Sequence, residues 1–533
     1  MKEHDPKSCR ICQANRPKGI EDMTPQQLAA REELQKPYLA GIAAGDAHRA
    51  AAARRVADHE AKEQASKIKV TLVIGVFFDG TGNNASNTEA GILCGAHHAV
   101  KPADLDSSCQ PYMSDPDSSY GNDFTNVKKL SDLYYAPDEL EGDRQEKMAY
   151  RKIYIDGIGT LARKKDSYLG SGLGRGETGV TARVQLAFDR IEEIISDLAK
   201  ENSSYAITHI IFDTFGFSRG AAAARHFANL VALGRRGPLR GTFIRQRQTF
   251  ERFFHDEYNC DIHIGFVGVF DTVASVIGMN SLLRFNRTGT DGLSLNLPRS
   301  QFPHVVHLVA RDEYRYNFPL SRVSAGHSEI TLPGAHSDIG GGYRLEAEEC
   351  LLVSPMQVLT VAKNCDVKST AIYHDAEQEM KRMIGDGWPA HLLEIITPEP
   401  TILDPDSTDR MAPRQKRIYV ALQLKRSVRG ELSQIYLRVM HQLAKQKKVR
   451  FLDIPELPNY IIPSELQSLC DRFVAGDYST TPGEEALLRA RYIHLSAHWN
   501  HPLGQAESGR HGPRVFYINS PAEARVRVLH PSA

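Results

Sequence analysis

The most constraining feature of the sequence is an apolar run that ends in a serine flanked by glycines. The stretch IIFDTFGFSRGAAAAR, residues 210–225, places Ser218 between Gly216 and Gly220. The residues before it predict a buried strand, and the alanines after it predict a helix that can lie close to a sheet. A strand that turns sharply into a helix presents a serine hydroxyl at the sheet edge. We therefore expect Ser218 to be a nucleophile, although a glycine-flanked serine in a packing turn is the plainer alternative.

The wider pattern predicts an α/β fold of the α/β-hydrolase type, with a mainly parallel sheet and flanking helices. Apolar, β-branched segments alternate with helical ones along the first two thirds of the chain, and a strongly periodic helix covers 178–200. Residues 84–123 are polar and read as a long loop. We expect three regions, namely an N-terminal helical extension (1–68), a catalytic domain (69–343) and a mostly helical C-terminal region (344–533). The expected strands are 67–80, 151–160, 206–215, 262–270, 304–310 and part of 328–343.

Composition excludes several classes of function. The 533 residues carry 65 basic and 65 acidic side chains, so no overall charge favours nucleic acid. No apolar run is long enough for a membrane span, and the N-terminus lacks the apolar core of a secretory signal. Cys9 and Cys12 form half of a zinc site at best. The glycine-rich stretch 171–179 follows no apolar strand, which argues against a phosphate loop. We expect neither a metal nor a cofactor.

A serine nucleophile needs a base, and the base needs an orienting carboxylate. Hydrolases of this architecture carry them in the order serine, acid, histidine, with the acid at a strand end and the histidine on a late loop. Asp271 follows the expected strand 262–270, and His336 lies in the glycine-rich stretch PGAHSDIGGGY. We therefore expect a Ser218–Asp271–His336 triad. The competing residues for the two supporting roles are Asp213, Asp338, His494 and His498.

The oxyanion of an acyl-transfer intermediate needs main-chain donors. The N–H of Arg219 follows the nucleophile and opens a helix, which makes it one expected donor. The second is expected from Gly80 or Thr81, in the loop of FFDGTGNN. Asp79 in the same loop is interpreted as a turn former rather than a metal ligand.

Five motifs in order carry a resemblance to a known family. They are VFFDGTGNN, YIDGIGT, FGFSRGAAAAR, GVFDTVAS and LPGAHSDIGGGY, spread over about half of the chain, residues 70–343. Together they resemble the first family of lipase effectors of bacterial type VI secretion. The resemblance implies an α/β-hydrolase phospholipase that cuts the sn-1 or sn-2 ester of membrane glycerophospholipids. Carried over motif by motif, it implies Ser218 as nucleophile, Asp271 as acid and His336 as base.

The resemblance also implies partners and a place of action. Such effectors are made without a signal peptide and are delivered by the secretion machine into the periplasm of a rival cell. They are usually paired with an immunity protein, and they often ride on the spike protein of the machine or on an adaptor. The C-terminal region is expected to be a lid or a lipid-docking surface. Its apolar stretches 394–403 and 458–469 suit a membrane interface, although core packing explains them equally well.

Two other functions stay open at this point. One is an esterase or thioesterase that acts on small soluble acyl substrates with the same triad. The other is a non-catalytic adaptor that keeps the fold, for which a disrupted triad would be the signature. All three triad residues are present in the sequence.

Overall fold

The computed structural model describes residues 67–93, 121–160, 179–274, 292–403, 414–499 and 519–531, with scattered residues between 24 and 55. Contacts divide the chain into two units, Met1–Lys67 and Ile68–Ala533. In the first unit, residues 44–55 are helical. The Cys9–Cys12 pair and residues 171–178 of the glycine-rich stretch lie outside the described residues. The boundary expected between 343 and 344 stays a prediction.

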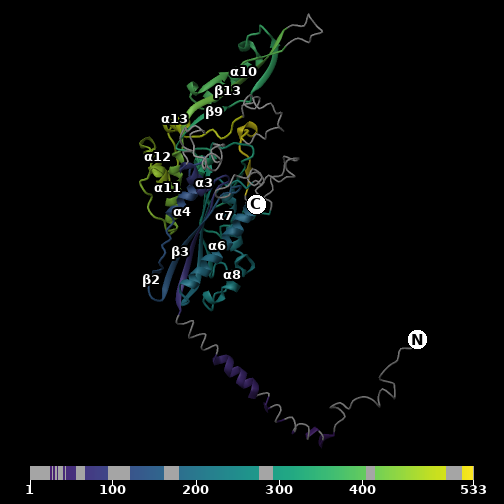
Figure 1. Ribbon diagram of the computed structural model, residues 1–533, viewed down its shortest axis with the longest axis vertical. Coiled ribbons are helices and arrows are strands. Elements are labelled where there is room, and N and C mark those ends of the chain that lie inside the picture. Colours follow the sequence, from purple (N-terminus) through teal and green to yellow (C-terminus); the bar gives the residue numbers. More distant parts are fainter. Residues whose placement is uncertain are drawn as a thin grey trace, which may run out of the picture. The chain divides into compact units, whose positions relative to one another are not determined.

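The second unit is built on a seven-stranded sheet with the order β2-β3-β1-β4-β5-β6-β8. All neighbouring strands are parallel except β2, which runs antiparallel to β3. This arrangement confirms the mainly parallel sheet, and Figure 1 shows its strands between two layers of helices. The strands are β1 (Ile68–Phe78), β2 (Glu141–Gly142), β3 (Glu146–Ile155), β4 (Tyr205–Phe217), β5 (Ile262–Phe270), β6 (Val305–Ala310) and β8 (Ser328–Leu332).

Two apolar cores, one on each face, hold the helices to this sheet. In β1 the even-numbered residues from Val70 to Phe78 pack with helices α6 (Val180–Glu201) and α7 (Arg219–Val231). Phe77 and the late β4 residues Phe215 and Phe217 point into the second core. That core contains α4 (Asn126–Leu133), α11 (Leu432–Gln446), α12 (Ser464–Ala475) and α13 (Pro482–Arg491). Alternate side chains thus face opposite layers, as in any sheet covered on both sides.

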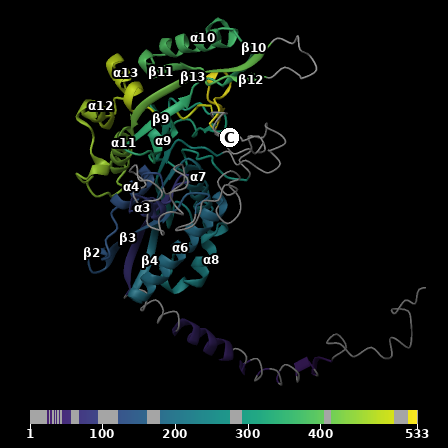
Figure 2. The same ribbon diagram turned by 45° about the horizontal axis from the view of Figure 1, so that its top comes forward.

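The C-terminal region contains an antiparallel sheet that the sequence interpretation missed. Four strands pair with the long strand β13 (Gln415–Arg429), and Figure 2 shows α10 (Ala371–Gly385) lying along it. Ile418, Val420, Leu422 and Leu424 alternate as buried residues of β13, which is the pattern of a strand with one packed face. The region therefore contains a five-stranded sheet in addition to the helices that were expected. The other strands are β9 (Glu346–Leu352), β10 (Gln357–Ala362), β11 (Leu393–Ile396) and β12 (Thr401–Leu403).

Several short elements complete the second unit. Residues 85–93, expected in a long loop, form helix α3 (Ala85–Leu93) instead. The asparagine side chain at 84 accepts the N–H of Asn87, which gives this polar stretch a helix start. Helix α8 (Leu239–Arg245) comes after α7 along the chain, and helix α9 (His336–Gly340) comes after β8. Near the end, β14 (Leu529–His530) pairs in parallel with β7 (Leu320–Ser321). Within the described residues, no helix is long and apolar enough to cross a membrane.

Candidate active site

Ser218 lies at the turn between β4 and α7, as the sequence predicts. Its backbone has φ 59° and ψ −122°, a conformation that non-glycine residues rarely adopt outside functional sites. The flanking glycines are required by close backbone approach. A Cβ on Gly216 would lie 2.3 Å from the Gly220 carbonyl oxygen, and one on Gly220 would lie 2.3 Å from the carbonyl oxygens of Phe78 and Asp79. The geometry is that of a nucleophile elbow pressed against the end of β1.

Asp271 and His336 meet although 65 positions separate them. The Nδ1 atom of His336 lies 2.5 Å from Oδ2 of Asp271, and both side chains are buried. Asp271 directly follows β5 and has φ 40°, a positive value that few non-glycine residues adopt. Its Oδ1 also accepts the N–H of Ala310, 3.0 Å away. The carboxylate is therefore placed to hold the imidazole with Nδ1 protonated and Nε2 available as a base.

The His336 ring packs beside the elbow. Its centroid lies 4.6 Å from that of Phe217, the residue before Ser218, and 5.0 Å from that of Phe318. Among the hydrogen bonds of the described residues, none joins the Ser218 hydroxyl to the imidazole. Serine–histidine contacts are often long in ligand-free enzymes and shorten when substrate binds. The structure thus brings the three residues into one neighbourhood and joins Asp271 to His336, the two that the sequence predicts as acid and base.

A fourth residue at this site was not foreseen. Arg527 donates from Nη1 to Oδ1 of Asp271 at 2.7 Å and from Nη2 to Oδ2 at 2.8 Å. It lies 256 positions from the aspartate, after residues 500–518, which fall outside the described part. No local motif surrounds it, so the sequence offers no signal that pairs it with Asp271.

These neighbours determine the protonation of the pair. Burial opposes ionisation of Asp271, but the charge of Arg527 and the hydrogen bonds from His336 and Arg527 outweigh it and hold the pKa of Asp271 well below its usual range. Burial lowers the pKa of His336 below its ordinary value, and the hydrogen bond with Asp271 offsets part of this effect. The aspartate is thus an anion and the histidine is neutral at neutral pH, as a general base must be.

The competing residues occupy other positions. Asp213 lies in the core, where its Oδ2 accepts the Tyr134 hydroxyl at 2.9 Å, and burial raises its pKa to about 7. Asp338 binds the His494 ring rather than His336. His498 contacts the side chain of Asn519, 3.2 Å away. None of the four supplies the acid or the base beside Ser218 through a contact within the described residues.

The loop after β1 is arranged around Asp79. Its carboxylate accepts the Gly80 N–H at 2.6 Å, the Thr125 hydroxyl at 2.8 Å and the Tyr154 hydroxyl. Burial, which these bonds partly offset, raises the pKa of Asp79 to about 6. The turn-forming interpretation of Asp79 agrees with these contacts. The Gly80 N–H, one of the two expected second oxyanion donors, is thus already engaged with Asp79, which leaves Thr81 as the candidate beside Arg219. The described residues offer no acceptor for the Thr81 N–H.

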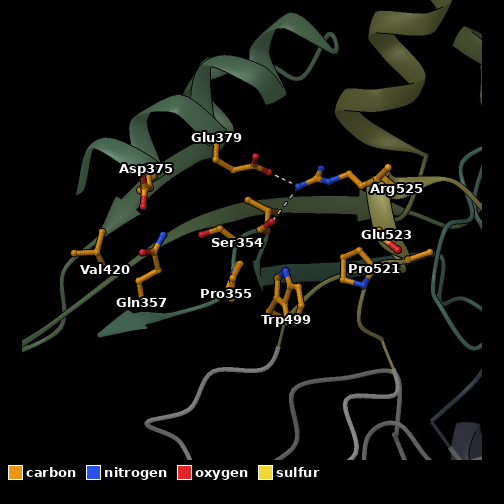
Figure 3. A pocket seen from close by; sticks show the side chains of 14 residues that line it. Ser354, Pro355, Gln357, Asp375, Glu379, Val420, Trp499, Pro521, Glu523 and Arg525 are labelled. Atoms are coloured by element: carbon orange, nitrogen blue, oxygen red, sulfur yellow. Dashed lines mark hydrogen bonds and ion pairs between the residues drawn. The ribbon is translucent and has the colours of Figure 1, made fainter. Parts of the chain in front are cut away.

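Two cavities lie away from the candidate catalytic residues. One of about 530 Å³ opens between β13, α10 and residues 521–525 (Figure 3). Arg525 reaches across one side of it to Glu379, and Trp499 lies on another side. A second cavity of about 450 Å³ is lined by residues that include Arg225 and Arg322. Neither is lined by Ser218, Asp271 or His336, so neither supplies the chemistry described above. Within the described residues, no cluster of acidic, histidine or cysteine side chains could hold a metal ion.

Comparison with known proteins gives a family match and similar solved structures. Residues 235–362 match the model described as "T6SS, Phospholipase effector Tle1-like, catalytic domain". This range contains Asp271 and His336 and begins after Ser218. The chain is also similar to a solved structure, described as the Tle1 effector bound to the VgrG spike from the type 6 secretion system. The two are 29% identical over 87% of this chain and 94% of that chain, with a TM-score of 0.66.

A second solved structure is an uncharacterized protein from Pseudomonas aeruginosa. It is 16% identical over 82% of this chain and 56% of that one, and its TM-score of 0.34 is too low to inform the fold. No curated protein sequence matches the chain. The family-model match and the similarity to the Tle1 effector structure confirm the family resemblance that the five motifs predict.

Proposed function

We propose that the chain is a serine phospholipase A that hydrolyses acyl esters of membrane glycerophospholipids, because residues 235–362 match the catalytic-domain model of Tle1-like phospholipase effectors and the fold is similar to that of a Tle1 effector. The observation that supports this most directly is the buried Asp271–His336 pair beside the strained Ser218 elbow. A strained serine turn and a carboxylate–imidazole pair at the end of a parallel sheet are the parts that a serine hydrolase needs.

The reaction follows from the positions of these side chains. The Ser218 hydroxyl attacks the ester carbonyl while His336 Nε2 takes its proton, which gives a tetrahedral oxyanion and an imidazolium beside Asp271. The N–H groups of Arg219 and Thr81 are the proposed donors to that oxyanion. Collapse of the intermediate breaks the ester bond, and the imidazolium passes its proton to the departing lysophospholipid. Water then attacks the acyl-Ser218 ester in the same way and releases the fatty acid.

Delivery is proposed by analogy with the similar structure. That structure holds the Tle1 effector bound to the VgrG spike, and the chain described here covers 94% of it. We propose that this chain likewise rides on a spike or adaptor protein and acts at the membrane in the periplasm of the target cell. A cognate immunity protein would protect the producing cell.

The C-terminal region is proposed to be a lid or lipid-docking surface. Its two apolar stretches divide between core and surface. Tyr460, Leu466 and Leu469 are buried, whereas Ile402 is 50% exposed and Ile461 is 52% exposed. The exposed isoleucines are the side chains that can enter a membrane interface.

Product analysis from defined phospholipids tests the proposal. Vesicles of a phospholipid with different acyl chains at sn-1 and sn-2 are incubated with the protein, and mass spectrometry identifies the fatty acid and lysolipid released. Release of one fatty acid by the wild type, and none by Ser218→Ala, is the expected result and gives the regiochemistry. Hydrolysis confined to short-chain esters or thioesters would favour the small-substrate enzyme. No hydrolysis of any ester would favour the non-catalytic adaptor.

A further inference from the structure

The last described segment of the chain forms a strap along the catalytic domain. This C-terminal strap, residues 519–530, lies beside residues 314–322 and is held there by main-chain hydrogen bonds. They join Ala522 N to Tyr314 O, Tyr316 N to Ser520 O, Leu320 N to Val528 O and Arg322 N to His530 O, at 2.8–3.0 Å. Arg527 is thereby fixed between two of these contacts, so its side chain enters the site from an anchored backbone.

All three nitrogens of the Arg527 guanidinium donate hydrogen bonds. Nη1 and Nη2 each donate to one oxygen of Asp271, and Nε donates to the Phe318 carbonyl oxygen at 2.8 Å. The side chain is only 8% exposed and that of Asp271 is not exposed at all. A planar, bidentate pair of this kind fixes orientation as well as charge, which a single-point cation cannot do.

We infer that Arg527 is a positioning residue of the catalytic site, which clamps the Asp271 carboxylate that orients His336 and balances its charge. This inference rests on the proposed function, because it assigns Arg527 a task in activating Ser218. Without the clamp, the Ala310 N–H would still hold Oδ1 of Asp271, but Oδ2 would lose its arginine partner, and the imidazole bound to Oδ2 would be held less firmly toward the elbow.

The charge balance around His336 involves four residues. Asp271 from the end of β5 and Glu313 from the loop after β6 are acidic, and Arg527 and Arg315 are basic. Arg315 is paired with Glu313 at 2.8 Å, so removal of Arg527 leaves one carboxylate uncompensated. A proton on the His336–Asp271 pair would then be held more tightly, since the nearby positive charge that opposes it has gone.

The groups on the far side of Asp271 do not restore this balance. His307 on β6 accepts the Thr272 N–H at Nε2, and its Nδ1 lies 3.2 Å from Glu329 Oε2 on β8. The imidazole can make both contacts as a neutral ring. Arg225 on α7 is committed to the main-chain oxygens of Leu295, Ser321 and Arg322. Arg527 is therefore the cation that directly contacts Asp271.

Three variants distinguish a role of Arg527 in positioning Asp271 from a role in merely holding the C-terminal strap in place. Arg527→Met removes charge and clamp, and Arg527→Lys keeps the charge without the bidentate fork. Arg525→Met is the matched control, because Arg525 anchors the same strap to Glu379 and the Val353 carbonyl oxygen without contacting Asp271. The readouts are the rate at which a fluorophosphonate labels Ser218 and the hydrolysis of a short-chain p-nitrophenyl ester, both as a function of pH, with thermal unfolding measured in parallel.

We expect Arg527→Met to slow labelling roughly 100-fold at neutral pH and to move the acid limb of the pH profile upward by about one unit. Arg527→Lys should lose roughly tenfold in rate with the acid limb unmoved, and Arg525→Met should keep the acid limb of the wild type. An Arg527→Met protein with a normal acid limb and near-normal rate would overturn the inference. If that variant does not fold, an Arg527→Lys protein with the kcat of the wild type would overturn it instead.

One further readout does not depend on catalysis. If the wild type neither reacts with the fluorophosphonate nor hydrolyses any ester, the proposed function fails, and NMR titration of the His336 ring in the wild type and Arg527→Met then decides the positioning claim. A higher midpoint in Arg527→Met supports the charge balance, and an unchanged midpoint contradicts it.

Discussion

Asp338, two residues after His336, forms a buried carboxylate–imidazole pair with His494. Oδ1 of Asp338 lies 2.7 Å from Nδ1 of His494. The other oxygen of Asp338 accepts the main-chain N–H groups of Ala335 and His494. The His494 ring also stacks on Tyr343, with 3.7 Å between centroids. This second pair therefore fastens the start of α9, which carries His336, to the C-terminal region. It resembles a catalytic dyad in chemistry but supports the site rather than taking part in it.

Replacement by alanine should lower stability at His494 and activity at His336. His494→Ala leaves the Asp338 carboxylate buried without its ring partner, so we expect the free energy of unfolding to fall by about 2–3 kcal/mol while hydrolysis continues. His336→Ala should reduce kcat by about 1,000-fold or more with little loss of stability, because Asp271 keeps its Arg527 partner. Denaturant unfolding and ester hydrolysis measure the two effects. An inactive but stable His494→Ala protein would contradict this division of roles.

Ser218→Gly should stabilise the protein while abolishing its activity. The positive φ of Ser218 costs a side chain about 1–3 kcal/mol, and glycine adopts it without strain. We expect a net gain of about 1 kcal/mol in the free energy of unfolding after the added flexibility of the unfolded chain is subtracted. Ser218→Ala is the control, since it is equally inactive but retains the strain. Equal stability of the two variants would mean that the turn is not strained.

Two glycine-to-alanine changes should move stability in opposite directions. A Cβ at Gly220 would meet the main-chain oxygens of Phe78 and Asp79 at 2.3 Å, which cannot give way as a side chain can. Gly220→Ala should therefore cost about 2–3 kcal/mol and disturb the elbow. Gly385 ends α10 with open space around it, so Gly385→Ala should gain about 0.5 kcal/mol. Thermal unfolding of both variants checks the pair, and a tolerated Gly220→Ala would refute the close approach.

Asp213 should make the stability of the protein fall as pH rises toward neutrality. Its folded-state pKa of about 7 lies above the ordinary aspartate value of 3.8, so the folded protein binds a proton that the unfolded chain has lost. That contribution is complete below about pH 4 and is lost as pH rises through about 7. Asp213→Asn cannot titrate and can still accept the Tyr134 hydroxyl bond.

Denaturant unfolding of the wild type and Asp213→Asn at several pH values measures this contribution. Between about pH 5 and pH 8 the wild type should lose roughly 2–3 kcal/mol relative to the variant. Parallel stability curves would show that Asp213 does not titrate in this range.

Much of the catalytic domain follows from local sequence. The strands before Ser218 and Asp271 are apolar and β-branched, and the small residues after Ser218 are those that the close approach to β1 requires. Because parallel strands end at one edge of a sheet, Asp271 and the turn after β8 could be placed near Ser218 without any long-range information. The Asp271 and His336 side chains do meet in the structure, while their catalytic roles stay a prediction.

The C-terminal sheet was missed because the helix propensity of its residues disagrees with the strand that the fold makes of them. Strand β9 has the sequence EAEECLL, whose glutamates, alanine and leucines favour a helix, yet it pairs along β13. The alternation in β13 itself, from Ile418 to Leu424, was the signal available. Arg527 carries no such signal, since only the fold brings it to Asp271.

The separation of Asp271 from Arg527 in the sequence also sets a delay during translation. A ribosome that has just incorporated Asp271 must add 256 residues before it reaches Arg527. At about 5–20 residues per second, that interval is on the order of 10–50 s. Ser218, Asp271 and His336 all leave the ribosome during synthesis without the arginine that holds the aspartate in the finished protein. A cell that makes this chain therefore completes the constellation around Asp271 last, after the rest of the catalytic domain has been made.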